Sequence, residues 1–384
     1  MEKIKKNSLI RLSKSCIGNE EKNAVLQVLD REYLGMGNDV LKFENQLTSF
    51  FNREALCVVN GTAALHLALQ ACGVGPGDEV LVPSLTYVAS FQAISATGAK
   101  PVACDVSIDT FTIDIKDLKQ RITNKSKVIM PVHFSGGVGD LDEVYSIAKE
   151  NNLRVVEDAA HAFGTIYNGT KIGSKGDIVC FSFDGIKNIT SGEGGAIVTS
   201  DKEVLNKVKD ARLLGVKNDT QKRYKGSRSW AFEVDEQGWR YHMSNIMAAI
   251  GIEQLKKFTS IASSRKHLAK LYDSCLKNSS KIYTLKHDYN CVLPHIYVIR
   301  VIGLRNREKL REMLLLRGVE TGIHYQPNHY LNFYKIEGLN LFNTNQISHE
   351  LISLPLHPEI TDKEIKYICN CLLESLEKSA YSIF

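Results

Sequence analysis

Asn60-Gly61-Thr62 lies where a short apolar run, 55–59, gives way to a helical pattern over 62–71. The first backbone N–H groups of a helix have no acceptor within the helix, and the helix dipole adds positive charge there. A glycine lets a ligand approach the backbone, and the Thr62 hydroxyl adds another donor. The segment is therefore suited to bind an anion such as a phosphate. It equally fits a capped helix that binds no ligand.

Two adjacent carboxylates, Glu157 and Asp158, end an apolar run over 154–158, and His161 follows shortly after. A charge at the end of a buried strand is costly unless it meets a positive partner. One interpretation is a site in which a carboxylate faces a cationic ligand. The other is a carboxylate that caps the next helix.

Lys187 lies in a loop between the apolar runs 178–183 and 196–199, just before Ser191-Gly192-Glu193-Gly194-Gly195. A lysine so close to the strand ends is expected to pair with an acid or to have a lowered pKa, which suits imine formation with an aldehyde. The spacing also fits a surface lysine. The cluster of glycines is tighter than a loop needs, which favours a site.

Taken together, the three motifs match the requirements of pyridoxal 5'-phosphate (PLP). A helix start holds the phosphate, a carboxylate keeps the pyridine nitrogen protonated, and a lysine forms an imine with the aldehyde. We therefore predict PLP as the cofactor, and we expect no metal.

With these motifs the sequence resembles the DegT/DnrJ/EryC1/StrS family of sugar aminotransferases, which have the fold-type I architecture of aspartate aminotransferase. The resemblance begins at Gly35-Met36-Gly37 and Phe43-Glu44, includes the three motifs, and extends to Leu354-Pro355-Leu356-His357-Pro358. Some relatives carry a histidine in place of the lysine and act as dehydratases. The lysine at position 187 favours transamination.

The resemblance implies a role for each candidate residue. Lys187 is the catalytic amine, which bonds the cofactor aldehyde and later moves protons. The implied cofactor contacts are Asp158 at the pyridine nitrogen, Tyr87 stacked on the ring, His161 beside the ring, and Thr62, Ala63 and Ser182 at the phosphate. Taken alone, Tyr87 also fits a packing role and His161 a turn cap.

The segment Gly238-Trp239-Arg240-Tyr241-His242-Met243 departs from the family, in which Gly-Tyr-Asn-Tyr-Arg-Met is common. In the family this Asn reaches the phosphate in the neighbouring protomer's site. Arg240 takes its position and can still meet a phosphate through a forked contact. Three roles stay open for Arg240: a cofactor contact, a contact with the substrate's diphosphate, and a rim residue without a ligand. The resemblance also implies a homodimer with shared active sites.

The family's substrates are mostly nucleotide-linked keto-sugars, with L-glutamate as the amino donor. The stretch 191–195 resembles members that act at C4 of a 4-keto-6-deoxy sugar, and Glu193 from it is a predicted substrate contact. The segment 324–329 resembles the family segment that lines the sugar pocket, and His329 from it is a second predicted substrate contact. The alternatives are a sugar 3-aminotransferase, a PLP-dependent sugar dehydratase, and a non-catalytic regulator that binds PLP or a sugar. The expected pathway is amino sugar synthesis for O-antigen or another polysaccharide. The loop 217–228 carries positive charge suited to a diphosphate or to a solvated face, from Lys217, Lys222, Arg223, Lys225 and Arg228.

Short β-rich runs alternate with helical patterns from about residue 55 to 200, which predicts an α/β fold. We expect a mostly parallel central sheet with helices on both faces, and a smaller C-terminal α/β domain. The predicted domains are 1–255, which binds PLP, and 256–384. Further predictions are an exposed loop over 215–229, a helix over 244–257, strands over 296–302 and 319–325, and a last helix from 362.

The composition of the 384 residues excludes several classes of protein. A net charge of +5 is too dilute for a nucleic-acid binder, and no apolar run is long enough to span a membrane. No GxGxxG motif follows the first strand, which argues against a nicotinamide cofactor. The charged start, 1–6, is not followed by an apolar stretch, so no signal peptide is expected. Nine cysteines without a CxxC pair favour a reducing compartment, and we expect a cytoplasmic protein.

Overall fold

The computed structural model describes residues 9–378 and residue 383, and it contains a seven-stranded sheet of order β1-β9-β8-β5-β4-β2-β3. Neighbouring strands from β8 to β3 run parallel, and only β9 runs in the opposite direction. The mostly parallel sheet predicted from the sequence is confirmed. The strands are β1 (Ala55–Val58), β2 (Glu79–Pro83), β3 (Lys100–Cys104), β4 (Ser126–Ile129), β5 (Arg154–Asp158), β8 (Ile178–Ser182) and β9 (Gly195–Thr199).

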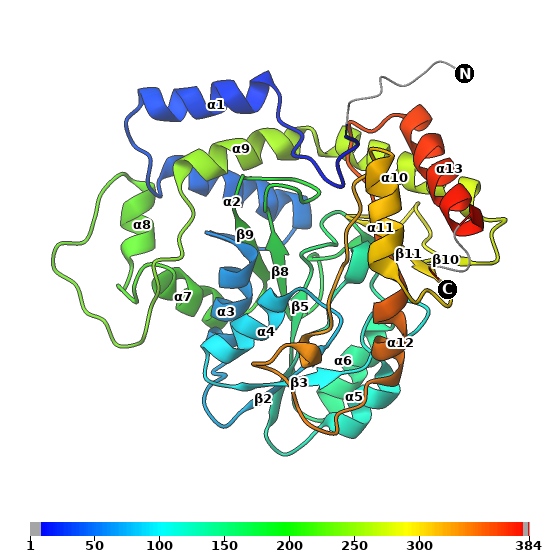
Figure 1. Ribbon diagram of the computed structural model, residues 1–384. Helices are drawn as coiled ribbons and strands as arrows, with labels where there is room; N and C mark the ends of the chain where they lie inside the picture. The colour runs from blue at the N-terminus through cyan, green and yellow to red at the C-terminus, as the bar shows by residue number, and fades with distance from the viewer. Residues whose placement is uncertain (1–8, 379–382, 384) are drawn as a thin grey trace.

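Helices cover both faces of this sheet (Figure 1). Successive strand residues alternate between two apolar cores, as in Val155 and Val156 of β5, because side chains in a strand point to opposite faces. One face packs against α2 (Asn38–Phe51), α5 (Ile115–Arg121), α6 (Leu141–Glu150) and α9 (Asn245–Lys256). The other face packs against α3 (Gly61–Ala71), α4 (Val88–Ala96) and α7 (Lys202–Ala211).

A second, antiparallel sheet of order β10-β11-β12 lies at one end of the molecule (Figure 1). Its core includes residues of three helices and also Ile10, from near the start of the described chain. The division between residues 255 and 256 stays a prediction. The elements are β10 (Ile282–Thr284), β11 (Tyr297–Val301), β12 (Leu351–Leu354), α10 (Phe258–Leu276), α11 (Arg307–Leu316) and α13 (Asp362–Lys378).

Two predicted elements are wrong. The expected loop 215–229 contains a short helix, α8 (Asp219–Tyr224), because Asp219 accepts hydrogen bonds from Arg223 and the Ser229 amide, and Thr220 is buried. The expected strand 319–325 forms only isolated bridges, Ile10 with Val319 and Gly322 with Ser353. The strand that pairs with β11 on this side is β12, and the segment 319–325 forms a backbone bridge to β12 only at Gly322.

Within the described part of the chain, no helix is long and apolar enough to cross a membrane. The charged segment 1–6, from which the absence of a signal peptide was predicted, lies outside the described residues.

Candidate active site

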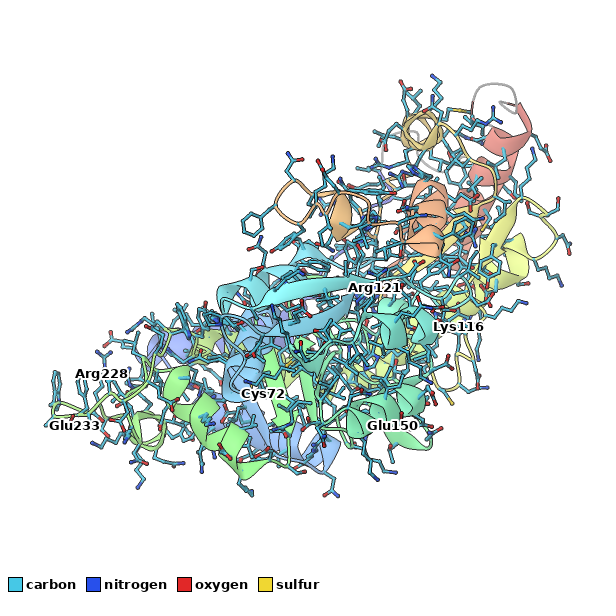
Figure 2. All side chains as sticks on the ribbon, turned by 90° about the horizontal axis from the view of Figure 1, so that it is seen from below. Cys72, Lys116, Arg121, Glu150, Arg228 and Glu233 are labelled. Atoms are coloured by element: carbon cyan, nitrogen blue, oxygen red, sulfur yellow. The ribbon has the colours of Figure 1, made fainter. Side chains whose placement is uncertain are left out.

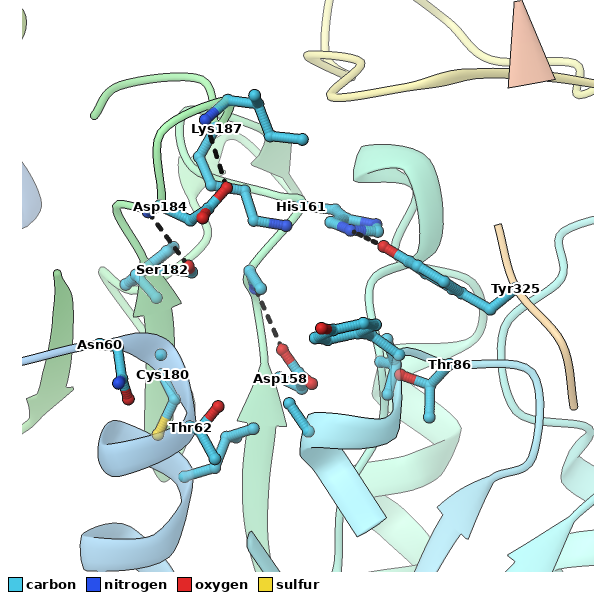
Figure 3. A pocket seen from close by; sticks show the side chains of 18 of the residues that line it. Asn60, Thr62, Thr86, Asp158, His161, Cys180, Ser182, Asp184, Lys187 and Tyr325 are labelled. Atoms are coloured by element: carbon cyan, nitrogen blue, oxygen red, sulfur yellow. Dashed lines mark hydrogen bonds between the residues drawn. The ribbon is translucent and has the colours of Figure 1, made fainter. Parts of the chain in front are cut away.

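A cavity of about 430 Å³ opens at the carboxyl ends of β5 and β8, where open α/β sheets bind their ligands. Figure 3 shows Lys187, His161 and Asp158 pointing into the same space. Seven of the predicted site residues line this cavity: Thr62, Tyr87, Asp158, His161, Ser182, Lys187 and Glu193.

The start of α3 forms one wall of the cavity. The Asn60 side chain caps the helix by accepting the Ala63 amide at 2.8 Å, and the helix itself offers no acceptor for the amides of Gly61 and Thr62. A Cβ at Gly61 would lie 2.8 Å from the Ser182 Cβ, so only glycine lets the helix start approach β8 this closely. The two amides and the Thr62 and Ser182 hydroxyls are suited to hold a phosphate.

Asp158 and Glu157 have different surroundings because they point to opposite faces of β5. Asp158 lines the cavity and accepts hydrogen bonds from the Ser90 hydroxyl at 2.7 Å and the Ala160 amide at 3.2 Å. Glu157 points away and bonds His133 at 2.7 Å and Tyr145 at 2.6 Å. Asp158 is therefore the carboxylate available to a ligand, and no described lysine or arginine forms an ion pair with it.

Lys187 is half-buried in the loop after β8. Burial lowers the pKa of its amine to about 8, against the opposing effect of Asp184 and Asp158. Its Nζ lies 3.4 Å from Nε2 of His295, which belongs to the segment before β11. A substantial fraction of this amine is neutral near physiological pH, as imine chemistry requires.

His161 is neutral, because burial and the Lys187 charge lower its pKa well below the usual value. Its Nδ1 accepts the Ser135 amide at 3.4 Å, so we infer that the ring proton is on Nε2. Nε2 lies 2.9 Å from the Tyr325 hydroxyl and donates to it. Burial and then the Asp158 charge raise the pKa of Tyr325, so its own proton stays in place and is free to point into the cavity.

Sequence reasoning missed three site residues that come from beyond the large sheet: His295, His324 and Tyr325. His324 and Tyr325 line the cavity, and His295 contacts Lys187. The segment 324–329 was recognised as pocket-lining, but His329 was chosen within it. A histidine directly before a predicted strand was the available signal for His295.

Three predicted contacts do not line this cavity. Ala63 is the third residue of α3, and its amide donates to the Asn60 side chain. Arg240 is exposed; it forms an isolated antiparallel bridge with Leu213, and His242 forms another with Val58. His329 is buried, with Nδ1 2.7 Å from the Ser84 hydroxyl and Nε2 2.8 Å from the Asn345 side-chain oxygen.

These residues fit PLP. A buried carboxylate without a cation partner suits a protonated pyridine, and an amine with a lowered pKa suits an aldehyde. The start of α3 suits the phosphate. Tyr87 is an aromatic side chain left 59% exposed beside the cavity, in position to stack on a ring.

Comparisons with known proteins agree with this chemistry. The sequence pattern of the DegT/DnrJ/EryC1/StrS aminotransferase family matches residues 15–373. Spore coat polysaccharide biosynthesis protein SpsC of Bacillus subtilis is 33% identical over 371 residues, which are 94% of this chain and 95% of SpsC.

Solved structures have the same fold. Spr1654 from Streptococcus pneumoniae in its PLP form has a TM-score of 0.88 and 31% identity, covering 96% of this chain and 99% of that chain. PseC from Helicobacter pylori, an aminotransferase involved in the biosynthesis of pseudoaminic acid, has a TM-score of 0.88 and 28% identity. That match covers 97% of this chain and 100% of PseC. The chain belongs to the DegT/DnrJ/EryC1/StrS aminotransferase family, has the fold-type I architecture, and is a PLP-dependent sugar aminotransferase.

Proposed function

We propose that this enzyme moves the amino group of L-glutamate to C4 of a nucleotide-linked 4-keto-6-deoxyhexose. The observation that carries the proposal is the convergence of Lys187 and Asp158 on one cavity beside the start of α3. When bound, PLP supplies an aldehyde and an electron-withdrawing ring that stabilises negative charge at the substrate carbon.

Lys187 acts as the general acid and base. Its Nζ would take the proton from the Cα of the amino donor in the first half-reaction and would give a proton to the sugar carbon in the second. A neutral amine is required for the first of these steps. The lowered pKa of Lys187 meets that need near neutral pH.

Asp158 and Tyr325 orient the reacting partners. The Asp158 carboxylate, fixed by Ser90 and Ala160, holds the proton of the pyridine nitrogen. The Tyr325 hydroxyl, which accepts from His161, donates into the cavity and binds an oxygen of the cofactor or substrate. These contacts place the substrate carbon within reach of Lys187.

The charge of the cavity supports a homodimer with shared active sites. The described residues that line it include the carboxylates Asp158, Asp184 and Glu193, but Lys187 is the only lysine or arginine among them. A cofactor phosphate, a nucleotide diphosphate and a dicarboxylate donor need more positive charge than this. We propose that Arg240 of a second protomer supplies part of it, at the cofactor phosphate or the substrate diphosphate.

The loop between α8 and Arg240 supports the same proposal. It projects from the body of the molecule, and Figure 2 shows Arg228 and Glu233 at its outer edge. Trp230 is 89% exposed there and Phe232 is 55% exposed. Two cations of the segment 217–228 form ion pairs: Lys217 with Asp235, and Arg223 with Asp219. The other three are exposed and available to a diphosphate: Lys222, Lys225 and Arg228.

The position of amination and the pathway rest on resemblance. The stretch 191–195 resembles relatives that act at C4, and Glu193 from it lines the cavity as a proposed sugar contact. His329 stays a predicted substrate contact. The name of SpsC supports a role in polysaccharide biosynthesis.

The test is a panel of dTDP-, UDP- and GDP-linked 4-keto and 3-keto sugars, incubated with ¹⁵N-labelled glutamate. Mass spectrometry and NMR of the products locate the nitrogen. We expect ¹⁵N at C4 of a 4-keto-6-deoxy sugar and formation of 2-oxoglutarate.

Each alternative has its own result in the same assay. Nitrogen at C3 would identify a 3-aminotransferase, and loss of a hydroxyl without nitrogen a dehydratase. If glutamate is not converted in the first half-reaction, the remaining alternative is the non-catalytic regulator that binds PLP or a sugar.

A further inference from the structure

Arg265 on α10 is a buried guanidinium, 2% exposed, whose hydrogen-bond acceptors are all backbone carbonyls. Nη1 donates to the carbonyls of His295 at 2.9 Å and Leu356 at 3.3 Å, and Nη2 donates to the carbonyl of Ile186 at 3.3 Å. Nε has no acceptor, and no carboxylate pairs with this group, within the part of the chain that the structure describes. An unpaired buried cation is costly, so its presence calls for a physical reason.

The acceptors of Arg265 surround Lys187. Ile186 directly precedes Lys187 in the chain. His295 places its Nε2 3.4 Å from the Lys187 Nζ. One guanidinium therefore links the peptide before the reacting amine to the backbone of His295, and both to the segment after β12 that contains Leu356.

We propose that Arg265 is a positioning residue that holds the Ile186–Lys187 peptide against the small sheet and places a fixed positive charge behind the Lys187 amine, so that Lys187 reacts in its neutral form. The inference rests on the proposed role of Lys187 as the reacting amine. A lysine in water is almost entirely protonated at neutral pH, and only the neutral amine can attack a carbonyl or accept a proton.

The carboxylates that face Lys187 favour its charged form, and the Arg265 charge opposes them together with burial. Asp184 in its own loop and Asp158 at the end of β5 both favour the ammonium form and raise the pKa of Lys187. Burial opposes them and is the largest effect, and the Arg265 charge adds to it. Arg265 keeps its own charge near neutral pH, because burial lowers its pKa only to about 10.

The other titratable groups around the two cations are uncharged near neutral pH. Burial lowers the pKa of His161, His295 and His324, so these imidazoles carry no charge beside Lys187. Burial raises the pKa of Tyr325, and it also raises that of Cys16, the thiol beside Arg265. Burial lowers the pKa of His357, the imidazole that faces Arg265. Arg265 is thus the charge that opposes the two carboxylates.

The experiment measures the pKa of Lys187 in the full-length protein freed of cofactor. A trace of acetic anhydride labels amines across a range of pH, and mass spectrometry quantifies the Lys187 peptide against an exposed lysine. In the native protein, the labelling of Lys187 should reach half of its maximum at a pH of about 8, which is the midpoint of its titration. In Arg265→Met the midpoint should rise by about one pH unit, because the opposing positive charge is lost. Arg265→Lys keeps the charge and should stay within roughly 0.3 units of native.

Arg300→Met is the matched control. Arg300 is also buried, on β11, but it pairs with Glu350 at 2.7 Å. Its removal perturbs the small sheet without removing the charge behind Lys187, so the Lys187 midpoint should not move. Circular dichroism establishes that each variant is folded.

The proposal is overturned if Arg265→Met leaves the midpoint unchanged, or if Arg265→Lys shifts it as far as Arg265→Met. Should Arg265→Met fail to fold, Arg265→Gln takes its place, because it keeps amide donors for the carbonyls and removes the charge; its midpoint should rise as well, and an unchanged midpoint overturns the proposal. The proposed function fails separately, when Lys187→Ala retains activity.

Discussion

Arg212 and Arg265 are both fully buried arginines, but their surroundings differ. Arg212 donates to Glu44 at 2.6 Å and to Tyr224 at 2.8 Å, so although burial alone would lower its pKa, these partners raise it. Arg265 has only carbonyl acceptors, and its pKa falls to about 10. The first region, which we call the Glu44–Arg212–Tyr224 cluster, neutralises its charge internally. The second lies behind the Lys187 cavity and does not.

The same contrast recurs within one strand. Glu157 has two hydrogen-bonding side chains, His133 and Tyr145, while Asp158 has only Ser90 and one backbone amide. A buried charge whose partners are complete supports the fold, and one whose partners are incomplete is available to a ligand. Substitutions in the two regions should therefore affect different measurements.

Lys187→Ala should have the largest effect. Without the amine, turnover should fall by at least about 10³-fold, and the visible absorbance of the cofactor imine should vanish. Lys175→Ala, at an exposed lysine outside the cavity, is the control and should keep both. An active Lys187→Ala enzyme would remove the basis of the proposed mechanism.

Asp158→Asn should lower the rate of the glutamate half-reaction by about 10²-fold or more, because the carboxylate that holds the pyridine proton is lost. Glu157→Gln changes the neighbouring residue on the other face of β5, and stopped-flow absorbance should show little change in this rate. Equal losses in both variants would mean that the contrast within β5 has no functional meaning.

Glu44→Gln should destabilise the fold by about 3 kcal/mol, since it leaves Arg212 as an uncompensated buried charge. Urea unfolding measures this loss. Glu54→Gln, which breaks the surface pairs with Lys202 and Lys209, should cost less than about 1 kcal/mol. A Glu44→Gln protein as stable as the native one would show that the cluster is not structural.

Ser90→Ala should have the smallest effect. It removes one hydrogen bond to Asp158, and kcat/KM for the amino donor should fall by about tenfold. Ser95→Ala on the same helix removes bonds to the Phe91 carbonyl and the Tyr334 hydroxyl, away from the cavity. It should leave kcat/KM unchanged, and a similar loss in both variants would point to the helix rather than to Asp158.

Much of the site was predictable because its signals are local. The run that becomes β5 ends in Glu157 and Asp158, two carboxylates that follow the apolar Val155 and Val156. The start of α3 is marked by Gly61-Thr62 after an apolar run, but its cap is Asn60 and not the expected threonine. The loop that carries Lys187 is likewise bounded by two apolar runs and glycines. Such features depend on residues that are close together in the sequence, and the periodicity and types of those residues predict them well.

Other features depended on contacts between distant segments. Tyr325 lies 164 residues along the chain from His161, His295 lies 108 from Lys187, and Arg265 lies 79 from Ile186, and no local pattern marks them as neighbours. The helix α8 depends on side-chain bonds of Asp219, and the segment 319–325 forms only isolated bridges because β12 pairs with β11. The sequence alone determined the strands of the large sheet and the reactive residue types, because these follow from local chemistry. Only the tertiary structure decided which buried charges found partners, because pairing requires packing that brings remote segments within hydrogen-bonding distance.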